Sequence, residues 1–342
     1  MTELRTPDPA MSAAQDSTVP RIWVLDDPRP GTSAQGIGIA ERLGEPFRRI
    51  PMRWNWKVHI AGLAANGSLA GLAAPGITEA DLRHPPALVI SAGRRSAAVA
   101  LWLKHVTGCK IVHCMSPGMA GVGRRGQFDL LVLPEHDRAP AAANVFTVLG
   151  APHRLSRQAL VEAKAAWAER LGHLPRPRVA LLVGGPPKST DMPPVLAHRL
   201  GQRVARLVVA RGGSIMATTS RRTGKEATEA LAAGMGPAMH VLYRWGEPGE
   251  NPYRGFLASA DTIIITSDSV SMISEACATD AAVYVALPEL ASARHRRLAH
   301  SLFAAGQAKP FDTSLAAWVR PPLDEATRVA GEIRRRFGMP LL

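Results

Sequence analysis

The sequence is poor in cysteine and in aromatic residues. Its three cysteines, Cys109, Cys114 and Cys277, form no C-x-x-C pair, so neither a disulfide framework nor a zinc knuckle is predicted. Aromatic residues make up 5% of the 342 residues and no recognised nucleic-acid-binding module is present, so nucleic acid is not the expected partner. No apolar run approaches the roughly 20 residues of a membrane-spanning helix. We therefore expect a globular protein of the reducing cytoplasm.

Several catalytic motifs are also missing. The sequence contains no D-x-D, no H-E-x-x-H and no G-x-S-x-G, which argues against metal-dependent sugar transfer, zincin and esterase chemistry. Gly31, Gly36 and Gly38 lack the spacing of G-x-G-x-x-G, which excludes a classical dinucleotide site near them. We expect no metal and no cofactor.

Acidic residues are outnumbered, with 28 Asp and Glu against 41 Lys and Arg, which gives a formal net charge of +13. Such an excess attracts nucleic acid, an acidic membrane surface or a phosphorylated substrate. Charge alone does not choose between these anions.

What the chain does contain is a repeated alternation of strand and helix patterns. Apolar, β-branched runs such as "RIWVLD", "PALVIS", "RVALLVGG" and "DTIIITS" are each followed by a stretch with helical spacing. Short strands alternating with helices predict parallel sheets covered on both faces. The length predicts two such α/β domains. We place a disordered tail at 1–20, a first domain at 21–171, a proline-marked linker at 172–178 and a second domain at 179–342. The last helix either closes the second domain or crosses back to the first.

The segment "SDSVSMISEA" follows a predicted strand and begins a helix. Ligands in open α/β sheets bind beyond the carboxyl ends of the strands, where helix N-termini present free N–H groups. Backbone N–H groups near Ser269, Val270 and Ser271 could hold a phosphate, and Glu275 could accept bonds from a ribose diol. The alternative is that Ser269 only caps the helix and Glu275 lies on its surface.

Three further stretches of the second domain suit an anion or precede a helix. "VGGPPKST" ends a strand with Gly184, Gly185 and Lys188, and it is equally well explained as a plain turn. "TTSRRTGKE" places cations at another strand end, unless they are merely solvated. "GENPY" contains an ordinary helix start. The residues that these stretches add to the candidate site are Ser220, Arg221, Arg222 and Asn251.

The first domain offers two weaker candidates. Asp27, after the first strand, could serve as a general base, and a structural role is an open alternative. The segment "PFRRIPMRWNWKVH" mixes cations with tryptophans, which suits an anionic membrane surface about as well as it suits core packing. The residues of this membrane or acceptor surface are Arg49, Arg53, Trp54, Trp56 and Lys57.

Taken in order, several stretches resemble the mitochondrial-fission, elongated-mitochondria-type family. They include "SAGRRSAAVALWLK", "FDLLVLPEHD", "PRPRVALLVGG", "GENPYRGFLASAD" and "TSDSVSMISEACATDAAVYV", and the resemblance spans about Arg21 to Gly306. Bacterial members of the family are described as glycosyltransferases or nucleoside-diphosphate-sugar epimerases, and a plant member is associated with mitochondrial division.

The second domain also resembles that of GT-B glycosyltransferases. The likeness implies two Rossmann-like domains in a GT-B-like arrangement with a cleft between them. By position, Gly184 and Gly185 match the Gly-rich loop, Ser269 and Val270 the phosphate turn, and Glu275 the ribose-binding acid. One departure is Asp268, an acid beside the phosphate turn, which repels a diphosphate unless it points away or meets Arg221 or Arg222.

The function expected from this resemblance is metal-independent transfer of a sugar from a nucleotide sugar. Helix N–H groups and arginines would stabilise the departing diphosphate, and Asp27 would deprotonate the acceptor. The basic, tryptophan-bearing segment is compatible with peripheral association at the inner membrane. Two alternatives stay open: a nucleotide-sugar epimerase on the same fold, and a non-catalytic scaffold.

Overall fold

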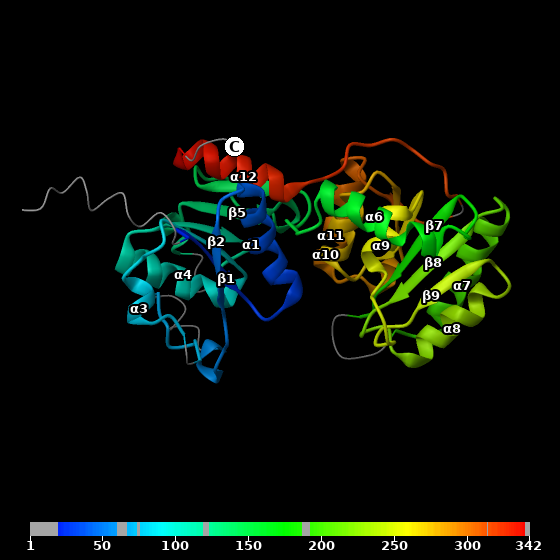
Figure 1. Cartoon of the computed structure of the whole chain (residues 1–342), viewed down its shortest axis with the longest axis horizontal. Helices are drawn as coiled ribbons and strands as arrows, with labels where there is room; N and C mark the ends of the chain where they lie inside the picture. The colour runs from blue at the N-terminus through cyan, green and yellow to red at the C-terminus, as the bar shows by residue number, and fades with distance from the viewer. Residues whose placement is uncertain are drawn as a thin grey trace, which may run out of the picture. The chain divides into compact units, whose positions relative to one another are not determined.

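The computed structural model describes residues 20–59, 67–73, 76–118, 123–186, 192–312 and 314–338. The chain divides into two compact units, each built on a parallel sheet (Figure 1). Unit 1 comprises 1–133, 141–146 and 329–342, and unit 2 comprises 134–140 and 147–328. In the described ranges, no helix has the length and apolar character needed to cross a bilayer.

The first sheet has the strand order β2-β1-β3-β4-β5-β6, and the pairs given for β1 to β5 are parallel. Its inner strands β3 and β5 are mainly apolar and buried at every position, as is typical of parallel sheets. The strands are β1 Ile22–Asp26, β2 Phe47–Pro51, β3 Leu88–Ala92, β4 Lys110–Cys114, β5 Leu130–Pro134 and β6 Val145–Val148. The helices between them are α1 Pro30–Leu43, η1 Trp56–His59, α3 Glu79–Leu82, α4 Arg94–Thr107 and η2 Arg125–Gln127.

The second sheet has the strand order β12-β11-β10-β7-β8-β9 and is parallel throughout. Its strands are β7 Arg178–Val183, β8 Ser214–Thr219, β9 His240–Tyr243, β10 Thr262–Thr266, β11 Ala282–Ala286 and β12 Lys309–Pro310. The helices are η3 Glu135–Asp137, α6 Arg157–Leu171, α7 Pro194–Val209, α8 Lys225–Met235, α9 Tyr253–Ser259, α10 Val270–Cys277, η4 Pro288–Leu290, α11 Ala293–Ala304 and α12 Glu325–Phe337.

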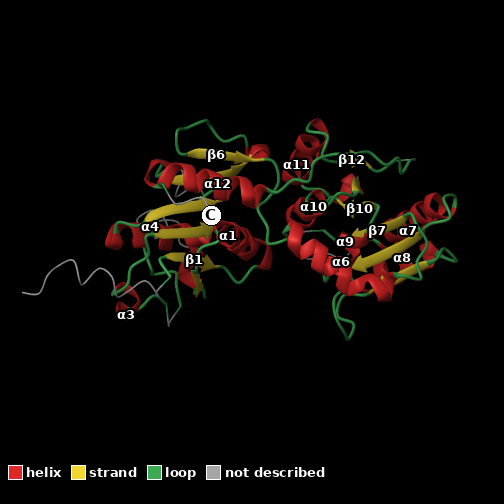
Figure 2. Ribbon diagram, turned by 45° about the horizontal axis from the view of Figure 1, so that its top comes forward, coloured by secondary structure: helices red, strands yellow, loops and turns green. Residues whose placement is uncertain are grey.

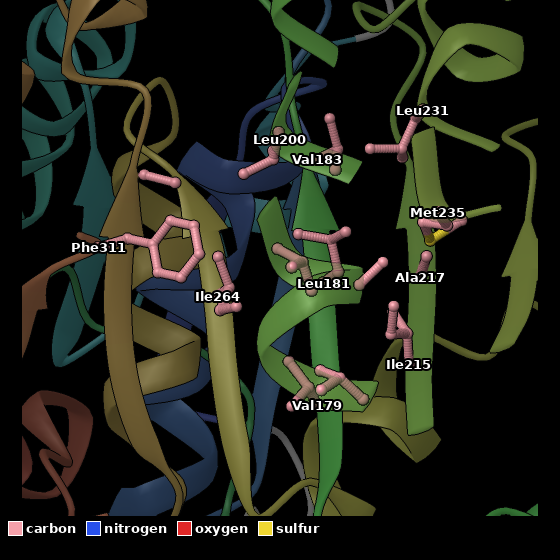
Figure 3. Close-up of a cluster of buried hydrophobic side chains, with 14 of the residues drawn as sticks. Val179, Leu181, Val183, Leu200, Ile215, Ala217, Leu231, Met235, Ile264 and Phe311 are labelled. Atoms are coloured by element: carbon pink, nitrogen blue, oxygen red, sulfur yellow. The ribbon is translucent and has the colours of Figure 1, made fainter. Parts of the chain in front are cut away.

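Helices cover both faces of the second sheet, because alternate strand residues point to opposite sides. Val179, Leu181 and Val183 of β7 face α7 and α8 in a cluster that includes Leu200 and Leu231 (Figure 3). The intervening strand residues join a second cluster with α6, α9, α10 and α11. Helices α7 and α8 lie side by side, as do α6 and α9 (Figure 2). The sheet is therefore held between two apolar layers, which fixes the positions of the loops at its edges.

The structure divides the chain at different places from those that the sequence suggests. Helix α6 and the segment 172–178 both lie inside unit 2, because Trp167 of α6 packs edge-on against Phe256 of α9. Helix α12 begins in unit 2, and its residues from Val329 onward belong to unit 1. There Arg334 donates to the carbonyls of Arg42 and Leu43 at the end of α1, a favourable place for a cation.

Candidate functional site

The strand order of unit 2 identifies where a ligand is expected. The strand order changes direction between the parallel neighbours β7 and β10: from β7 the chain proceeds outward to β8 and β9, and from β10 it proceeds the other way to β11 and β12. In open α/β sheets such a switch point forms a crevice at the carboxyl edge. The loops after β7, β8 and β10 carry the glycines, arginines and serines singled out from the sequence.

Asp268 lies at the centre of this edge. Its side chain is fully buried, and its Oδ2 atom accepts from the backbone N–H of Gly185 at 2.9 Å and from Arg222 Nη2 at 3.0 Å. The other oxygen, Oδ1, is buried and has no hydrogen-bond partner in the part of the chain that the structure describes. The repulsion expected between Asp268 and a phosphate is therefore reduced by Arg222, one of the two arginines named for that purpose.

The two glycines after β7 are required by this packing. A Cβ atom on Gly184 would lie 2.1 Å from Asp268 Oδ2, and one on Gly185 would lie 2.0 Å from the carbonyl oxygen of Arg222. Both distances are far below van der Waals contact. The loop after β7 thus touches the loops after β8 and β10 directly. Thr223 also ties β8 to β7, because its Oγ1 donates to the carbonyls of Val183 and Gly184.

Helix α10 begins beside Asp268. Ser269 is its N-cap and accepts from the N–H of Met272 at 3.4 Å, so the capping role considered for this serine is observed. The N–H groups of Val270 and Ser271 have no acceptor among the described residues. These two donors, at the positive end of the helix dipole, are available to an anion.

Glu275 follows one and a half turns into α10. Its Oε2 atom accepts a 2.6 Å bond from the hydroxyl of Tyr253, the first residue of α9. Burial raises the pKa of Glu275, and the bond from Tyr253 and the charge of Arg254 only partly oppose this effect. No described residue bonds to its other oxygen, which leaves an acceptor for a ligand hydroxyl.

The other predicted donor-site residues are less engaged. Arg221 is exposed, and Ser220 Oγ accepts from the N–H of Arg222. Asn251 Oδ1 accepts from the N–H of Tyr253 just before α9 begins, and Pro252 is the N-cap of that helix. Lys188 lies outside the described residues.

Trp245 was not predicted from the sequence. It follows β9 at the same edge of the sheet and is 55% exposed. Its backbone N–H donates to Thr219 Oγ1 at 3.1 Å. A tryptophan two residues beyond a strand would have been the signal.

The structure surrounds Asp27 of unit 1 with donors. Its carboxylate accepts from the N–H, Nε and Nη2 atoms of Arg29 and from Trp54 Nε1, and its side chain is 1% exposed. Burial raises the pKa of Asp27, but the bonds from Arg29 and Trp54 outweigh burial and hold it below 3.8. A weakly basic, fully bonded carboxylate is poorly suited to general-base catalysis, so these contacts favour the structural alternative.

The predicted membrane or acceptor surface is only partly a free surface. Arg49 makes an ion pair with Asp26 through Nη2 at 2.6 Å, and Trp54 is bonded to Asp27. Arg53, Trp56 and Lys57 are exposed, and the Trp56 side chain is 71% accessible. The surface that stays available to a partner is reduced to these three residues, which we call the Trp56 patch.

A family model described as "Mitochondrial fission ELM1" matches residues 30–337. The chain belongs to this family. Among its relatives, the mitochondrial fission protein ELM1 of Arabidopsis thaliana is 28% identical over 80% of this chain and 71% of its own length. An uncharacterized protein of Rickettsia prowazekii (strain Madrid E) is 25% identical over 92% of this chain and 97% of its own length. The resemblance predicted from the sequence is therefore confirmed.

Solved structures extend the likeness to the fold of this ELM1-family chain. The UDP-GlcNAc 2-epimerase of Methanocaldococcus jannaschii is similar with a TM-score of 0.54 and 12% identity, covering 93% of this chain and 99% of its own. MurG of Acinetobacter baumannii is similar with a TM-score of 0.50 and 13% identity, covering 94% and 92%. At such low identity the likeness shows the fold alone. It confirms the predicted fold class, two Rossmann-like α/β domains of the GT-B kind.

Proposed function

We propose that this ELM1-family protein is a metal-independent glycosyltransferase whose unit 2 binds a nucleotide-sugar donor. One observation carries the proposal: at the switch point of the second sheet, free N–H groups of α10 adjoin a buried aspartate whose charge is balanced by Arg222. A Rossmann-like sheet with an anion-binding helix start at this place is a common way to hold a diphosphate.

The proposed position of the nucleotide follows from donors and acceptors that no described residue uses. The diphosphate accepts from the N–H groups of Val270 and Ser271, with exposed Arg221 able to reach it from the loop after β8. The ribose donates to the unbonded oxygen of Glu275. The base stacks on Trp245, an exposed aromatic at the same sheet edge. In transfer, these helix N–H groups and arginines stabilise the negative charge that develops on the leaving diphosphate.

The base and the sugar are proposed by analogy with the solved neighbour of this fold. That protein's name states that it is an epimerase of UDP-GlcNAc, so uridine diphosphate sugars are the first donors to test. The acceptor is proposed to lie at an anionic membrane surface reached by the Trp56 patch, whose cation and aromatic suit such a surface.

A thermal-shift panel of nucleoside diphosphates and nucleotide sugars tests the donor site. A ligand that binds only the folded protein stabilises it by about 2.7 kcal/mol at one hundred times its Kd. We expect a base-selective shift with the wild type, and a large reduction with Glu275→Ala and with Trp245→Ala. Loss of base stacking costs about 1–3 kcal/mol, which corresponds to roughly 5-fold to 150-fold in affinity.

Trp56→Ala is the matched control, because it removes an exposed tryptophan from the other unit. Its shift should equal that of the wild type. If no nucleotide shifts the wild type, the donor site is wrong and the scaffold alternative gains. If a UDP sugar binds and is converted without any acceptor, the enzyme is an epimerase rather than a transferase.

A further inference from the structure

The start of helix α11 has an unusual charge pattern. Its first five residues, "ARHRR", contain three arginines and a histidine and no acid. Cations at a helix N-terminus are disfavoured, because the helix dipole already places positive charge there. Only part of this charge is neutralised: Arg294 pairs with Asp137 at 3.2 Å, and Arg297 Nε donates to the carbonyl of His136. The excess of positive charge is relieved if an anion binds.

A buried histidine lies against the same turn. Helix η3 packs on α11, and it carries His136, whose side chain is fully inaccessible. Both ring nitrogens are buried without a hydrogen-bond partner in the described ranges, and Asp137 Oδ1 is 3.7 Å from Nε2, too far for a bond. An unbonded buried imidazole costs free energy, so its presence calls for a partner beyond those that the described residues provide.

This cluster adjoins the proposed diphosphate site. Strands β10 and β11 are neighbours, and Ser267 at the end of β10 donates to the carbonyl of Leu287 beyond β11. Burial lowers the pKa of His295, while Asp268 raises it and Arg294 and Arg222 lower it, so these charges lie close enough to interact. Asp268, whose Oδ1 atom is buried without a partner among the described residues, is therefore a charged neighbour of His295.

Two backbone N–H groups that follow the N-cap Ser292 are unused at the start of α11 among the described residues. The hydroxyl of Ser292 accepts from the N–H of His295, and its carbonyl accepts from Arg296. The N–H groups of Ala293 and Arg294 have no acceptor among the described residues. Burial lowers the pKa of His136 to about 4, so its ring is neutral at pH 7 and presents one N–H donor. Donors from the backbone, a guanidinium and an imidazole are thus gathered at one place.

We propose that the first turn of α11, together with His136 and Arg294, binds an acidic group, a phosphate or a carboxylate, carried by the sugar end of the donor. The existence of this anion site stands on the cluster itself. That its anion belongs to the sugar rests on the proposed function. The preferred donor is then a nucleotide sugar with a negative charge on the sugar, rather than a neutral one.

The first experiment uses inorganic phosphate as the probe at constant ionic strength. We expect phosphate to raise the melting temperature of the wild type, and the rise to be lost in Arg294→Gln and His136→Leu. The second variant also removes two unbonded buried nitrogens, so without ligand it should be as stable as the wild type or more so. A merely structural histidine would not separate stability from phosphate binding in this way.

Arg296→Gln is the charge-matched control. This arginine lies in the same turn, but its Nη1 donates to the carbonyl of Ala291 rather than to Asp137 or His136. The control should keep the phosphate effect. If all three variants respond to phosphate like the wild type, or if the wild type does not respond at all, the anion site is wrong.

The second experiment compares UDP-glucose with UDP-glucuronic acid, which differ by one carboxylate. The wild type should bind the glucuronate at least tenfold more tightly, and Arg294→Gln should bind both alike. Equal affinities in the wild type would refute the assignment to the sugar, even if phosphate binds at α11. If phosphate binds and neither nucleotide does, the proposed donor function is refuted while the anion site is retained.

Discussion

Each of the two units buries an aspartate at the carboxyl edge of its sheet, and the two aspartates differ in how completely they are bonded. Asp27 accepts four hydrogen bonds shared between its two oxygens. Asp268 accepts two, both on Oδ2, and its Oδ1 is buried with no partner among the residues that the structure describes. The hydrogen bonds of a fully bonded buried acid are sufficient to explain its burial by a structural role. A half-bonded one calls for a ligand or a strain that the rest of the fold supports.

The same contrast extends to the neighbours of each aspartate. Around Asp27, Arg29 and Trp54 give their donors to the carboxylate itself. Around Asp268, the N–H groups of Val270 and Ser271 and the side chain of Arg221 stay unused among the described residues. Ligand binding is therefore expected beside Asp268 at the edge of the second sheet, while the carboxylate of Asp27 is already fully hydrogen-bonded within unit 1.

The largest expected effect follows from the close contact at the second edge. Gly185→Ala places a Cβ atom 2.0 Å from the Arg222 carbonyl oxygen, which is backbone and cannot simply rotate away. We expect a loss of about 3 kcal/mol in the free energy of unfolding, together with loss of nucleotide-dependent stabilisation. Urea unfolding with and without ligand measures both.

Gly212→Ala is the control for this substitution. Gly212 has a positive φ of 63°, but a Cβ there meets nothing within 4 Å. Its cost should be only the left-handed backbone strain of about 1 kcal/mol, with ligand binding unchanged. Equal costs at the two glycines would mean that the loops after β7 and β8 are not packed as closely as described.

Much of the fold could be predicted from the sequence, because it depends on local patterns. The alternation of buried β-branched runs with helical spacing defined the strands around Val179 and Ile263 without any knowledge of tertiary contacts. The unit boundary could not be predicted in this way. Helix α6 belongs to unit 2 because Trp167 packs against Phe256. A contact between residues so distant in sequence leaves no local pattern.

The site was predictable as a set of strand ends but not as a set of partners. The position of Ser269 after β10 indicated a helix cap and a phosphate turn, and the cap is present. Arg222 rather than Arg221 bonds to Asp268, and Arg29 bonds to Asp27. These pairings depend on side-chain geometry in the loops, which the sequence does not show. That both ring nitrogens of His136 are buried without a partner among the described residues is likewise visible only in the structure.

A smaller effect is expected from Asp27→Asn, and it should depend on pH. The folded-state pKa of Asp27 is held below 3.8, so the stability from its ionised form is present above about pH 4 and is lost as pH falls through the folded value. We expect the variant to be less stable than the wild type by about 2 kcal/mol at pH 7. The difference should shrink as pH falls below about 4 and the carboxylate becomes protonated.

Thermal unfolding across this pH range measures the difference, with the exposed Asp280→Asn as a control for losing one negative charge. If Asp27 instead served as the catalytic base, its replacement would abolish transfer while leaving stability almost unchanged at neutral pH. That result would overturn the distinction between the two aspartates.

The smallest expected effect concerns the Trp56 patch, whose three side chains are exposed. Lys57 lies over the Trp56 ring at 5.9 Å, and both side chains are exposed. Each cation near an anionic bilayer contributes about 1 kcal/mol, so Trp56→Ala with Lys57→Gln should weaken binding to phosphatidylserine-containing vesicles by roughly fivefold. Added salt should reduce the wild-type affinity toward that of the variant, since surface charge is screened. Trp245→Ala, which removes the exposed tryptophan of unit 2, should leave vesicle binding unchanged. If Trp245→Ala weakens vesicle binding and the Trp56 variant does not, the membrane-binding surface lies on unit 2 and the Trp56 patch does not bind the anionic membrane.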